Sequence, residues 1–349
     1  MTRSVISLTV LLGTLVFGVV PSQAEEGAKP VETYRLPLPT RRPHPKYPAV
    51  ARMRAQEGWV EVQFMVDPNG KPYEITVTDS MGHAEFSKAA VRAVEGWEYD
   101  AARMNGQPLD AAARQRLIFS MTGTGAGVRS VFSQRFISIK MHIKENERTE
   151  ALELLEKAES RNLYEEVFLQ IGWYLFHLRW GTPEQQRIAL TRASASDPDT
   201  SHVPVDFIQM IMLARFRTEI QTNHLGAALI TAKAVSRLQE EGKVKLEADR
   251  LRSLNETVSK IEALKKDDVA FSVNGVIGEH ANWTYSLLKD EMTFHVLEGE
   301  IAELKLRCDR RYVGFRFAAD STFKIPESYG NCQLEVIGNP GTTFTLTQS

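Results

Sequence analysis

The stretch that decides the first fold of this chain is residues 45–72, PKYPAVARMRAQEGWVEVQFMVDPNGKP. Two prolines flank Tyr47, and a proline has no backbone N–H to donate to a sheet. After Gly58, apolar and polar side chains alternate over residues 60–66, as in a β-strand with one face against a core. The sequence DPNG at residues 67–70 then predicts a turn. A stiff segment that pairs poorly in a sheet therefore precedes a hairpin, which suggests a unit that binds another protein chain rather than one that does chemistry.

A second strand, a helix and a final strand complete this unit over residues 45–122. The second strand is predicted at residues 73–77 from its alternating pattern. Apolar residues at helical spacing then predict a helix that packs on the sheet: Phe86, Ala90, Val94 and Trp97. After a turn at residues 105–108, NGQP, the alternating run RQRLIFSM at residues 114–121 predicts the last strand. Three strands and one helix leave edges of the sheet open.

The first 24 residues have the features of a cleavable signal peptide. Arg3 precedes an apolar run at residues 5–20, and Ser22-Gln23-Ala24 is a small-x-small cleavage site before Glu25. The apolar run is short for a membrane span of about 20 residues. We therefore expect export and cleavage after Ala24, with an uncleaved membrane anchor as the alternative.

Shifts in composition divide the rest of the chain. Residues 25–44 are polar and contain several prolines, which predicts an extended lead-in. The glycine-rich residues 123–132 lack a P-loop lysine and are typical of a linker. Residues 133–266 show amphipathic helices that resemble helical repeats, although no clean repeat period is present. Residues 268–349 return to period-two alternation, which predicts a small antiparallel β domain. The predicted fold class is thus α+β and multi-domain, with a ββαβ unit, then helices, then a β domain.

The two cysteines of the chain, Cys308 and Cys332, fall at the edges of predicted strands in the last part. An exported chain can oxidise them. We predict a disulfide that joins two strands and stabilises the fold by roughly 3 kcal/mol in the chain-entropy treatment. Two buried free thiols are the alternative.

The sequence carries no signature of common catalytic chemistry. Its eight histidines form no His-x-x-x-His pair and there is no Cys-x-x-Cys, so a metal site is unsupported. No Gly-x-Ser-x-Gly motif is present. The net charge of −2 gives no reason to expect binding to nucleic acid or to an anionic membrane surface. We expect no catalytic residue, no cofactor and no enzymatic activity. A hydrolase or carbohydrate-binding role for the last domain is an alternative, with a sugar platform at Trp283, Tyr285 and Tyr312, whose rival role is core packing.

Residues 45–121 resemble the C-terminal domain of the TonB energy-transducer family. The resemblance rests on a string of positions at specific spacing: Tyr47-Pro48, Gly58, Val66-Asp67, Gly70, Phe86, Ala89-Ala90-Val91, Trp97-Glu98-Tyr99, Gly106 and Pro108. It covers roughly a quarter of the chain. The resemblance implies a bacterial protein in the periplasm whose ligand is another protein.

The resemblance also implies where a partner binds. In that family the partner is an outer-membrane transporter, whose short extended segment adds a strand beside the last strand of the domain. The segment before the Tyr-Pro pair contacts the partner as well. Carried over to this chain, the candidate partner-binding residues are Arg42, His44, Lys46 and Tyr47 in the lead-in, and Arg116, Leu117, Ile118, Phe119 and Ser120 in the receiving strand. A free strand edge offers backbone hydrogen bonds to an extended peptide, and a proline-stiffened lead-in loses little further entropy when it docks. Tyr47 has an alternative role as a cover of the core.

The chain departs from the family pattern before the domain. Family transducers keep a membrane anchor and a long proline-rich spacer, whereas only residues 25–44 separate the leader from the domain here. We therefore expect a periplasmic binding module related to TonB-dependent transport rather than a classical energy transducer. The alternatives are a transducer anchored in the inner membrane by a retained leader, and an envelope scaffold or assembly factor in which the domain forms oligomers, for example a homodimer.

Overall fold

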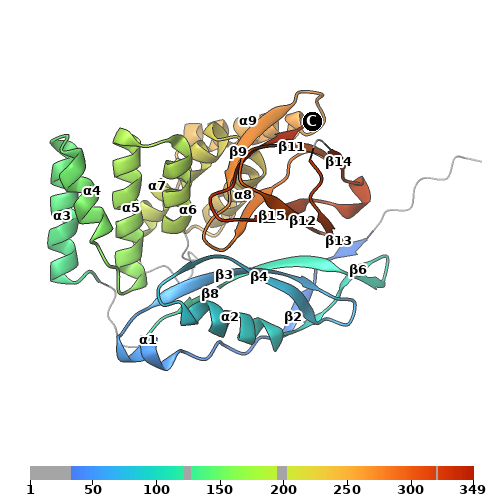
Figure 1. The fold of residues 1–349 in the computed structure, drawn as a ribbon, viewed down its shortest axis with the longest axis horizontal. Coiled ribbons are helices and arrows are strands. Elements are labelled where there is room, and N and C mark those ends of the chain that lie inside the picture. The colour runs from blue at the N-terminus through green and yellow to red at the C-terminus, as the bar shows by residue number, and fades with distance from the viewer. Residues whose placement is uncertain (1–32, 122–126, 195–202, 320) are drawn as a thin grey trace, which may run out of the picture.

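The structure is a computed structural model that describes residues 33–121, 127–194, 203–319 and 321–349. The described chain folds into three regions in sequence order: a β/α region, a helical region and an antiparallel β region (Figure 1). This order confirms the predicted fold class. The predicted signal peptide and residues 123–126 of the predicted linker lie outside the described residues. No helix within the described residues is both long and apolar enough to span a membrane.

The first region is built on a three-stranded antiparallel sheet with strand order β4-β3-β8. The strands are β3 (Gly58–Val66), β4 (Pro72–Met81) and β8 (Ala111–Phe119). Helix α2 (Glu85–Glu95) packs across one face (Figure 1). The predicted apolar stripe faces this core, in which Phe86, Ala90, Val94 and Trp97 are buried with Leu117 and Phe119. The alternation of the strands and the helical spacing therefore predicted the packing correctly.

Short strands frame this sheet. They are β1 (Tyr34–Arg35), β2 (Leu38–Arg41), β5 (Glu98–Asp100), β6 (Ala102–Met104) and β7 (Gln107–Leu109), with helix α1 (Ala49–Met53) after the lead-in. β1 pairs with β6 and β2 pairs with β5. The predicted turn joins β6 to β7, and Asn105 and Gly106 adopt φ values of 49° and 81° there, as tight hairpin turns require. The described part of the lead-in thus pairs with β5 and β6 and leaves the outer edge of β8 open.

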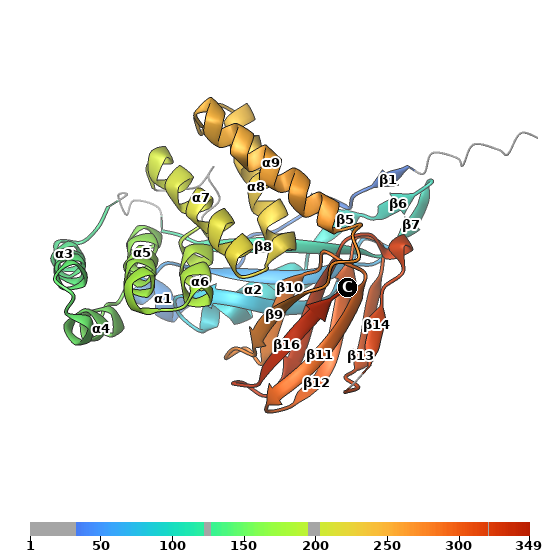
Figure 2. The ribbon, with the colours of Figure 1, turned by 90° about the horizontal axis from the view of Figure 1, so that it is seen from above.

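The helical region consists of seven described helices. They are α3 (Ser130–Lys144), α4 (Arg148–Glu156), α5 (Leu163–Trp180), α6 (Pro183–Ala193), α7 (Val205–Gln221), α8 (Leu225–Glu240) and α9 (Ala248–Leu264). Prolines act at helix starts: Pro183 opens α6 after a capping box between Thr182 and Gln185, and Pro204 precedes α7. The helices line up side by side along the molecule (Figures 1 and 2).

The last region contains two four-stranded antiparallel sheets, with strand orders β10-β15-β12-β13 and β14-β11-β16-β9. The strands are β9 (Phe271–Val276), β10 (Asn282–Ser286), β11 (Glu291–Glu298), β12 (Ile301–Cys308), β13 (Tyr312–Arg316), β14 (Thr322–Lys324), β15 (Cys332–Gly338) and β16 (Thr343–Gln348). Cys308 of β12 lies opposite Cys332 of β15, and the two form a disulfide, as predicted.

The aromatic residues considered as a sugar platform pack within this region or against the first region. Trp283 and Tyr285 are buried and their rings stack at 5.3 Å. Tyr312 is half-buried, and its ring contacts that of Tyr73 of the first region at 6.0 Å. The prediction of a sugar platform is therefore wrong, because these rings pack in the core of the β region or at its contact with the first region.

The second face of the first sheet is covered as well. The structure buries Glu61 and Gln63, the polar residues of β3, although the alternation would allow a solvent-exposed face. Trp59 packs there against Leu163 of α5, and the other two regions lie on this side, opposite α2 (Figure 1). The sheet is thus the middle layer of the molecule, and its edges decide what can reach its backbone.

Candidate functional site

The outer edge of β8 is one of the two edges of the first sheet, β4 forming the other. β8 pairs with β3 over all nine positions from Ala111 to Phe119, and no strand of the described residues pairs with its other side. A strand edge of this kind presents backbone N–H and C=O groups to any extended chain that lies beside it.

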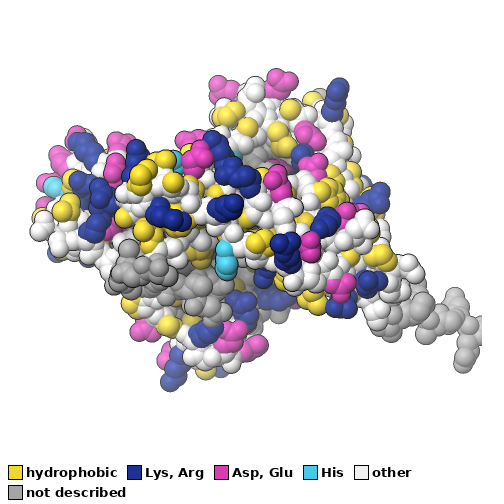
Figure 3. Space-filling model, turned by 90° about the horizontal axis from the view of Figure 1, so that it is seen from below, with side chains coloured by type: hydrophobic (Ala, Val, Ile, Leu, Met, Phe, Trp, Pro, Cys, Tyr) yellow, Lys and Arg dark blue, Asp and Glu magenta, His cyan; other side chains and the backbone are white. Residues whose placement is uncertain are grey.

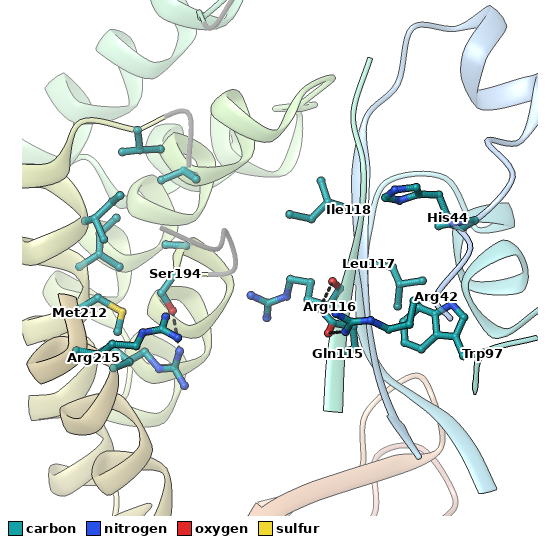
Figure 4. Close-up of a pocket in the computed structure, with 18 of the residues that line it drawn as sticks. Arg42, His44, Trp97, Gln115, Arg116, Leu117, Ile118, Ser194, Met212 and Arg215 are labelled. Atoms are coloured by element: carbon teal, nitrogen blue, oxygen red, sulfur yellow. Dashed lines mark hydrogen bonds between the residues drawn. The ribbon is translucent and has the colours of Figure 1, made fainter. Parts of the chain in front are cut away.

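A groove runs along this edge. It encloses about 580 Å³ and has two walls, one from β8 and the lead-in and one from the helical region (Figure 4). The volume falls within the range of about 300–1,000 Å³ that is common for ligand pockets. The lining residues of the first wall are Arg42, Pro43, His44, Pro45, Trp97, Gln115, Arg116, Leu117 and Ile118.

Polar contacts hold the lead-in against β8. The Trp97 indole N–H donates to the Pro43 carbonyl at 3.1 Å, and the Arg42 guanidinium lies over the Trp97 ring, 5.7 Å from its centroid. Arg42 Nη1 donates to Gln115 Oε1 at 2.9 Å, and Gln115 Nε2 donates to the Arg116 carbonyl at 3.0 Å. A side chain therefore occupies one backbone acceptor of β8 in the absence of a partner.

The second wall comes from helices that follow the first region in the sequence. It contains apolar side chains of α7, Ile208, Ile211 and Met212, together with Arg215 of α7 and Arg237 of α8. Arg215 donates to the buried Glu219 at 2.7 Å and to Ser194 Oγ at 2.8 Å. Its guanidinium is therefore fixed beside the groove rather than free to fold away.

An ion cluster lies under the open edge. Glu61 of β3 accepts hydrogen bonds from Arg116 at 2.5 Å and forms an ion pair with Arg114. Burial acts to raise the pKa of Glu61, but the Arg114 and Arg116 guanidiniums outweigh it and hold this pKa below its usual value. Burial lowers the pKa of Arg116, and the nearby Arg215 charge adds to this effect. The edge of β8 is thus bordered by fixed positive charge.

The structure brings together some of the sequence-predicted residues and separates others. Arg42 and His44 line the groove with Arg116, Leu117 and Ile118. Lys46 is exposed outside the groove, and Ser120 follows the end of β8 at Phe119. Phe119 is buried in the core, so that its backbone is what an incoming strand would meet.

Tyr47 covers the core, as its alternative role anticipated. Its ring makes edge contacts with Phe86 at 5.5 Å and with Phe119 at 6.0 Å. The hydroxyl donates to the Gln56 carbonyl at 2.5 Å. Burial raises the pKa of Tyr47 to about 12. The side chain is therefore largely committed to packing within the first region.

Sequence reasoning missed several parts of the groove, among them Pro43, Pro45 and Trp97 of the first wall. It missed Gln115, whose alternation with Leu117 gave the only available signal, and it missed the whole helical wall. Helical periodicity indicates that Ile208 and Met212 lie on the same face of a helix, but it does not indicate which strand this face packs against.

The comparisons with known proteins agree with the first region. The family described as Gram-negative bacterial TonB protein C-terminal matches residues 43–121. The protein named tonB2 from Pseudomonas aeruginosa is 38% identical over 68 residues, which are 20% of this chain and 25% of that protein. The chain thus covers a quarter of the length of this curated relative.

Two solved structures are similar to parts of the chain. One is the solution NMR structure of the Pseudomonas aeruginosa TonB C-terminal domain, which is 26% identical in sequence. The alignment covers 25% of this chain and 87% of the chain in that structure, with a TM-score of 0.23. The other is the structure of the tonB2 protein from Vibrio anguillarum, which is 24% identical in sequence. The alignment covers 33% of this chain and 98% of the chain in that structure, with a TM-score of 0.20.

The matched residues and the sheet with its single helix define the class of the first region. Residues 43–121 are a TonB C-terminal domain within a longer chain of 349 residues. The helical region and the β region lie outside the match.

Proposed function

We propose that this protein is a periplasmic binding module that engages an outer-membrane TonB-dependent transporter, or another envelope protein, by β-strand addition to β8. The observation that carries the proposal is the edge of β8, with which no other described strand pairs, along a groove of about 580 Å³. An extended partner segment would gain backbone hydrogen bonds from the edge and side-chain contacts from both walls.

The family of the first region supports the class of partner. A TonB-family domain implies binding of a TonB-dependent outer-membrane receptor, and its place is the periplasmic side of the envelope. Members of this family are energy transducers rather than enzymes. In the described residues, no group of three or more His, Cys, Asp or Glu side chains could hold a metal ion. The family of the first region therefore supports protein binding as the function of this domain.

Whether the leader is cleaved distinguishes a free binding module from an anchored transducer. We propose that the leader is cleaved after Ala24, so that the chain works without its own membrane anchor. Mass spectrometry of the protein purified from its native envelope should find Glu25 as the first residue. A first residue at Met1 would instead support the anchored transducer.

A pull-down tests strand addition directly. The Gln115 side chain reaches the Arg116 carbonyl at the open side of β8, and residues two apart on a strand direct their backbone groups to the same side. The N–H of Ile118 therefore belongs to the open edge, and Ile118→Pro removes it without touching the ladder to β3.

The baits are residues 25–349 as wild type, Ile118→Pro and Ile118→Ala, incubated with detergent-solubilised outer membranes. Ile118→Ala is the matched control, because it loses the same contact with Trp59 and Leu163 but keeps the N–H. We expect wild type and Ile118→Ala to capture a transporter and Ile118→Pro to capture none. Equal capture by all three baits, each verified as folded by circular dichroism, would contradict strand addition.

A further inference from the structure

Half of the groove is built outside the TonB C-terminal domain. The residues of the second wall belong to α5, α6, α7 and α8 or to their ends, and all of them follow residue 121, where the family match stops. A TonB C-terminal domain by itself would offer the β8 edge with one wall only. In this chain an incoming segment is enclosed between the edge and the helices.

The geometry of a sheet decides what each wall would contact. Side chains along a strand point alternately to the two faces of its sheet. Gln115 and Leu117 lie on the α2 face, with Trp97 and His44 beside them, whereas Arg116 and Ile118 lie on the face toward the helices (Figure 4). A segment added to β8 continues this sheet, so every second side chain of that segment would face the helical wall.

The charge of the groove is one-sided. Arg42, Arg116, Arg215 and Arg237 line it, and no Asp or Glu is present among its described lining residues. Three of these arginines form ion pairs with carboxylates outside the lining: Arg116 with Glu61, Arg215 with Glu219 and Arg237 with Glu241. Arg116 and Arg215 point into the groove from opposite walls (Figure 4). Lys and Arg side chains are also prominent across the middle of the face that carries α1 and α2 (Figure 3). Like charges that face each other across a gap favour an anionic group between them.

Apolar side chains accompany these charges on the helical wall. Ile208, Ile211 and Met212 border the groove next to Arg215, and Arg237 extends from α8 with a side chain that is 58% exposed and lies 3.8 Å from the Glu241 carboxylate. The wall therefore offers an apolar surface with guanidinium groups at its margin, which suits a short extended segment that is apolar and carries a carboxylate.

We propose that the helical region acts as a selective second wall, which chooses an extended partner segment with an acidic side chain on its helix-facing side. The proposal rests on strand addition at β8 and adds the chemistry of the occupant. Recognition is then a joint property of two regions of the chain: backbone pairing comes from β8, and the choice of sequence comes from α7 and α8.

A peptide-display selection tests this assignment. A library of random peptides about twelve residues long, enough to run past β8 at about 3.3 Å per residue, is selected against residues 25–349. Parallel selections use Arg237→Glu and Arg252→Glu. Arg252 lies on α9 with a side chain that is 69% exposed and outside the groove, so its reversal is the matched control for net charge. Ile118→Pro is the control for strand addition.

We expect wild type and Arg252→Glu to enrich peptides with Asp or Glu between alternating apolar residues, and Arg237→Glu to lose this enrichment. A selected peptide should bind wild type about tenfold more tightly than its Asp→Asn counterpart in fluorescence anisotropy, as for one charge-assisted contact. If the selected peptides require the Ile118 N–H but show no preference for acidic residues, the proposed selectivity of the helical wall is refuted, whereas strand addition at β8 is supported. Peptides enriched equally by Ile118→Pro, or no enrichment at all, would overturn both proposals.

Discussion

At the scale of single residues, Gln115 controls access to the open edge. Its amide accepts from Arg42 and donates to the Arg116 carbonyl, so one acceptor of β8 is satisfied within the chain. A partner strand that uses this carbonyl must displace the Gln115 side chain. The closed arrangement is therefore a cost that binding has to overcome.

Gln115→Ala should strengthen binding of a peptide that adds to β8. A hydrogen bond of this kind contributes about 1 kcal/mol, which corresponds to about a fivefold lower Kd. Isothermal titration of the selected peptide against wild type and variant measures the change. Gln115→Glu is the control, because its carboxylate keeps the contact with Arg42 but cannot donate to the carbonyl. Weaker binding by Gln115→Ala would show that the side chain contacts the partner instead.

His224 makes the stability of the fold depend on pH. It is buried at the start of α8 beside Glu184, Arg187, Trp283 and Tyr285. Burial lowers the pKa of His224 to about 4, and the Arg187 charge adds to this. The unfolded chain binds the proton below about pH 6.5. The contribution of neutral His224 is thus complete above pH 6.5 and is lost as the pH falls toward 4, by about 3 kcal/mol at most.

Denaturant unfolding of wild type and His224→Gln at pH 7 and pH 4.5 measures this contribution. The free energy of unfolding should fall more steeply with acid in wild type than in His224→Gln. Lowered pKa values of carboxyls such as Glu61 and Glu165 also reduce stability in acid, but they act on both proteins alike. His280→Gln, at an exposed position, should keep the wild-type slope. Parallel slopes for wild type and His224→Gln would contradict the account.

At the scale of elements, the disulfide joins two neighbouring strands of one sheet. Cys308 and Cys332 are buried and lie directly opposite each other on β12 and β15, 24 residues apart in sequence. Replacement of both by Ala should lower the free energy of unfolding by about 3 kcal/mol, from the lost constraint on the unfolded chain. Thermal unfolding checks it, with dithiothreitol as a second route to the reduced form. An unchanged Tm would mean that the two strands are held by packing alone.

The local sequence pattern correctly predicted those helices and strands whose apolar residues follow a single periodicity. The alternation around Val60 and Leu117 and the helical spacing of Phe86 and Val94 determine their own structure, because each pattern matches one periodicity. The short strands β1, β2 and β5 were not predicted, since two to four residues are too few to show a period. Their pairing is decided by where the lead-in meets Tyr99 and Met104, which is a tertiary contact.

At the scale of the whole molecule, a buried arginine connects the last region to the first. Arg307 of β12 is 1% exposed and forms an ion pair with Glu335 of β15. Its second amino group donates to the Glu74 carbonyl at 3.1 Å and to Thr76 Oγ1 at 2.8 Å, both on β4. Glu74 has a φ of 49°, at an irregular position of the strand. The β region is thus fixed to β4, while no described strand pairs with the outer edge of β8.

Arg307→Met should destabilise the molecule by about 3–5 kcal/mol, because it leaves the Glu335 carboxylate buried without its positively charged partner, with the Asn282 amide still donating to it. The double variant with Glu335→Leu should recover much of that loss. Denaturant unfolding measures the stability, and hydrogen exchange should show faster exchange of the β4 amides in both variants. A loss below about 1 kcal/mol in the single variant would indicate that the pair contributes little.

The groove between β8 and the helical region could not be predicted from the sequence, because it is formed by tertiary contacts between two regions of the chain. Arg42, His44, Arg116 and Ile118 were identified from the family resemblance, the last two on a strand that the sequence pattern predicted. Arg215 and Arg237 were not, since nothing local states that α7 and α8 would lie beside β8. The order of the three regions follows from sequence, whereas the wall arises only when they pack together.

The most direct test of the central claim is an N-methyl scan of a peptide that binds residues 25–349. One series carries N-methyl groups at odd positions and the other at even positions, with side chains unchanged. Because only every second residue of an added strand directs its backbone toward β8, we predict that one series loses binding and the other keeps it. Equal affinity of the two series would contradict strand addition at the edge of β8.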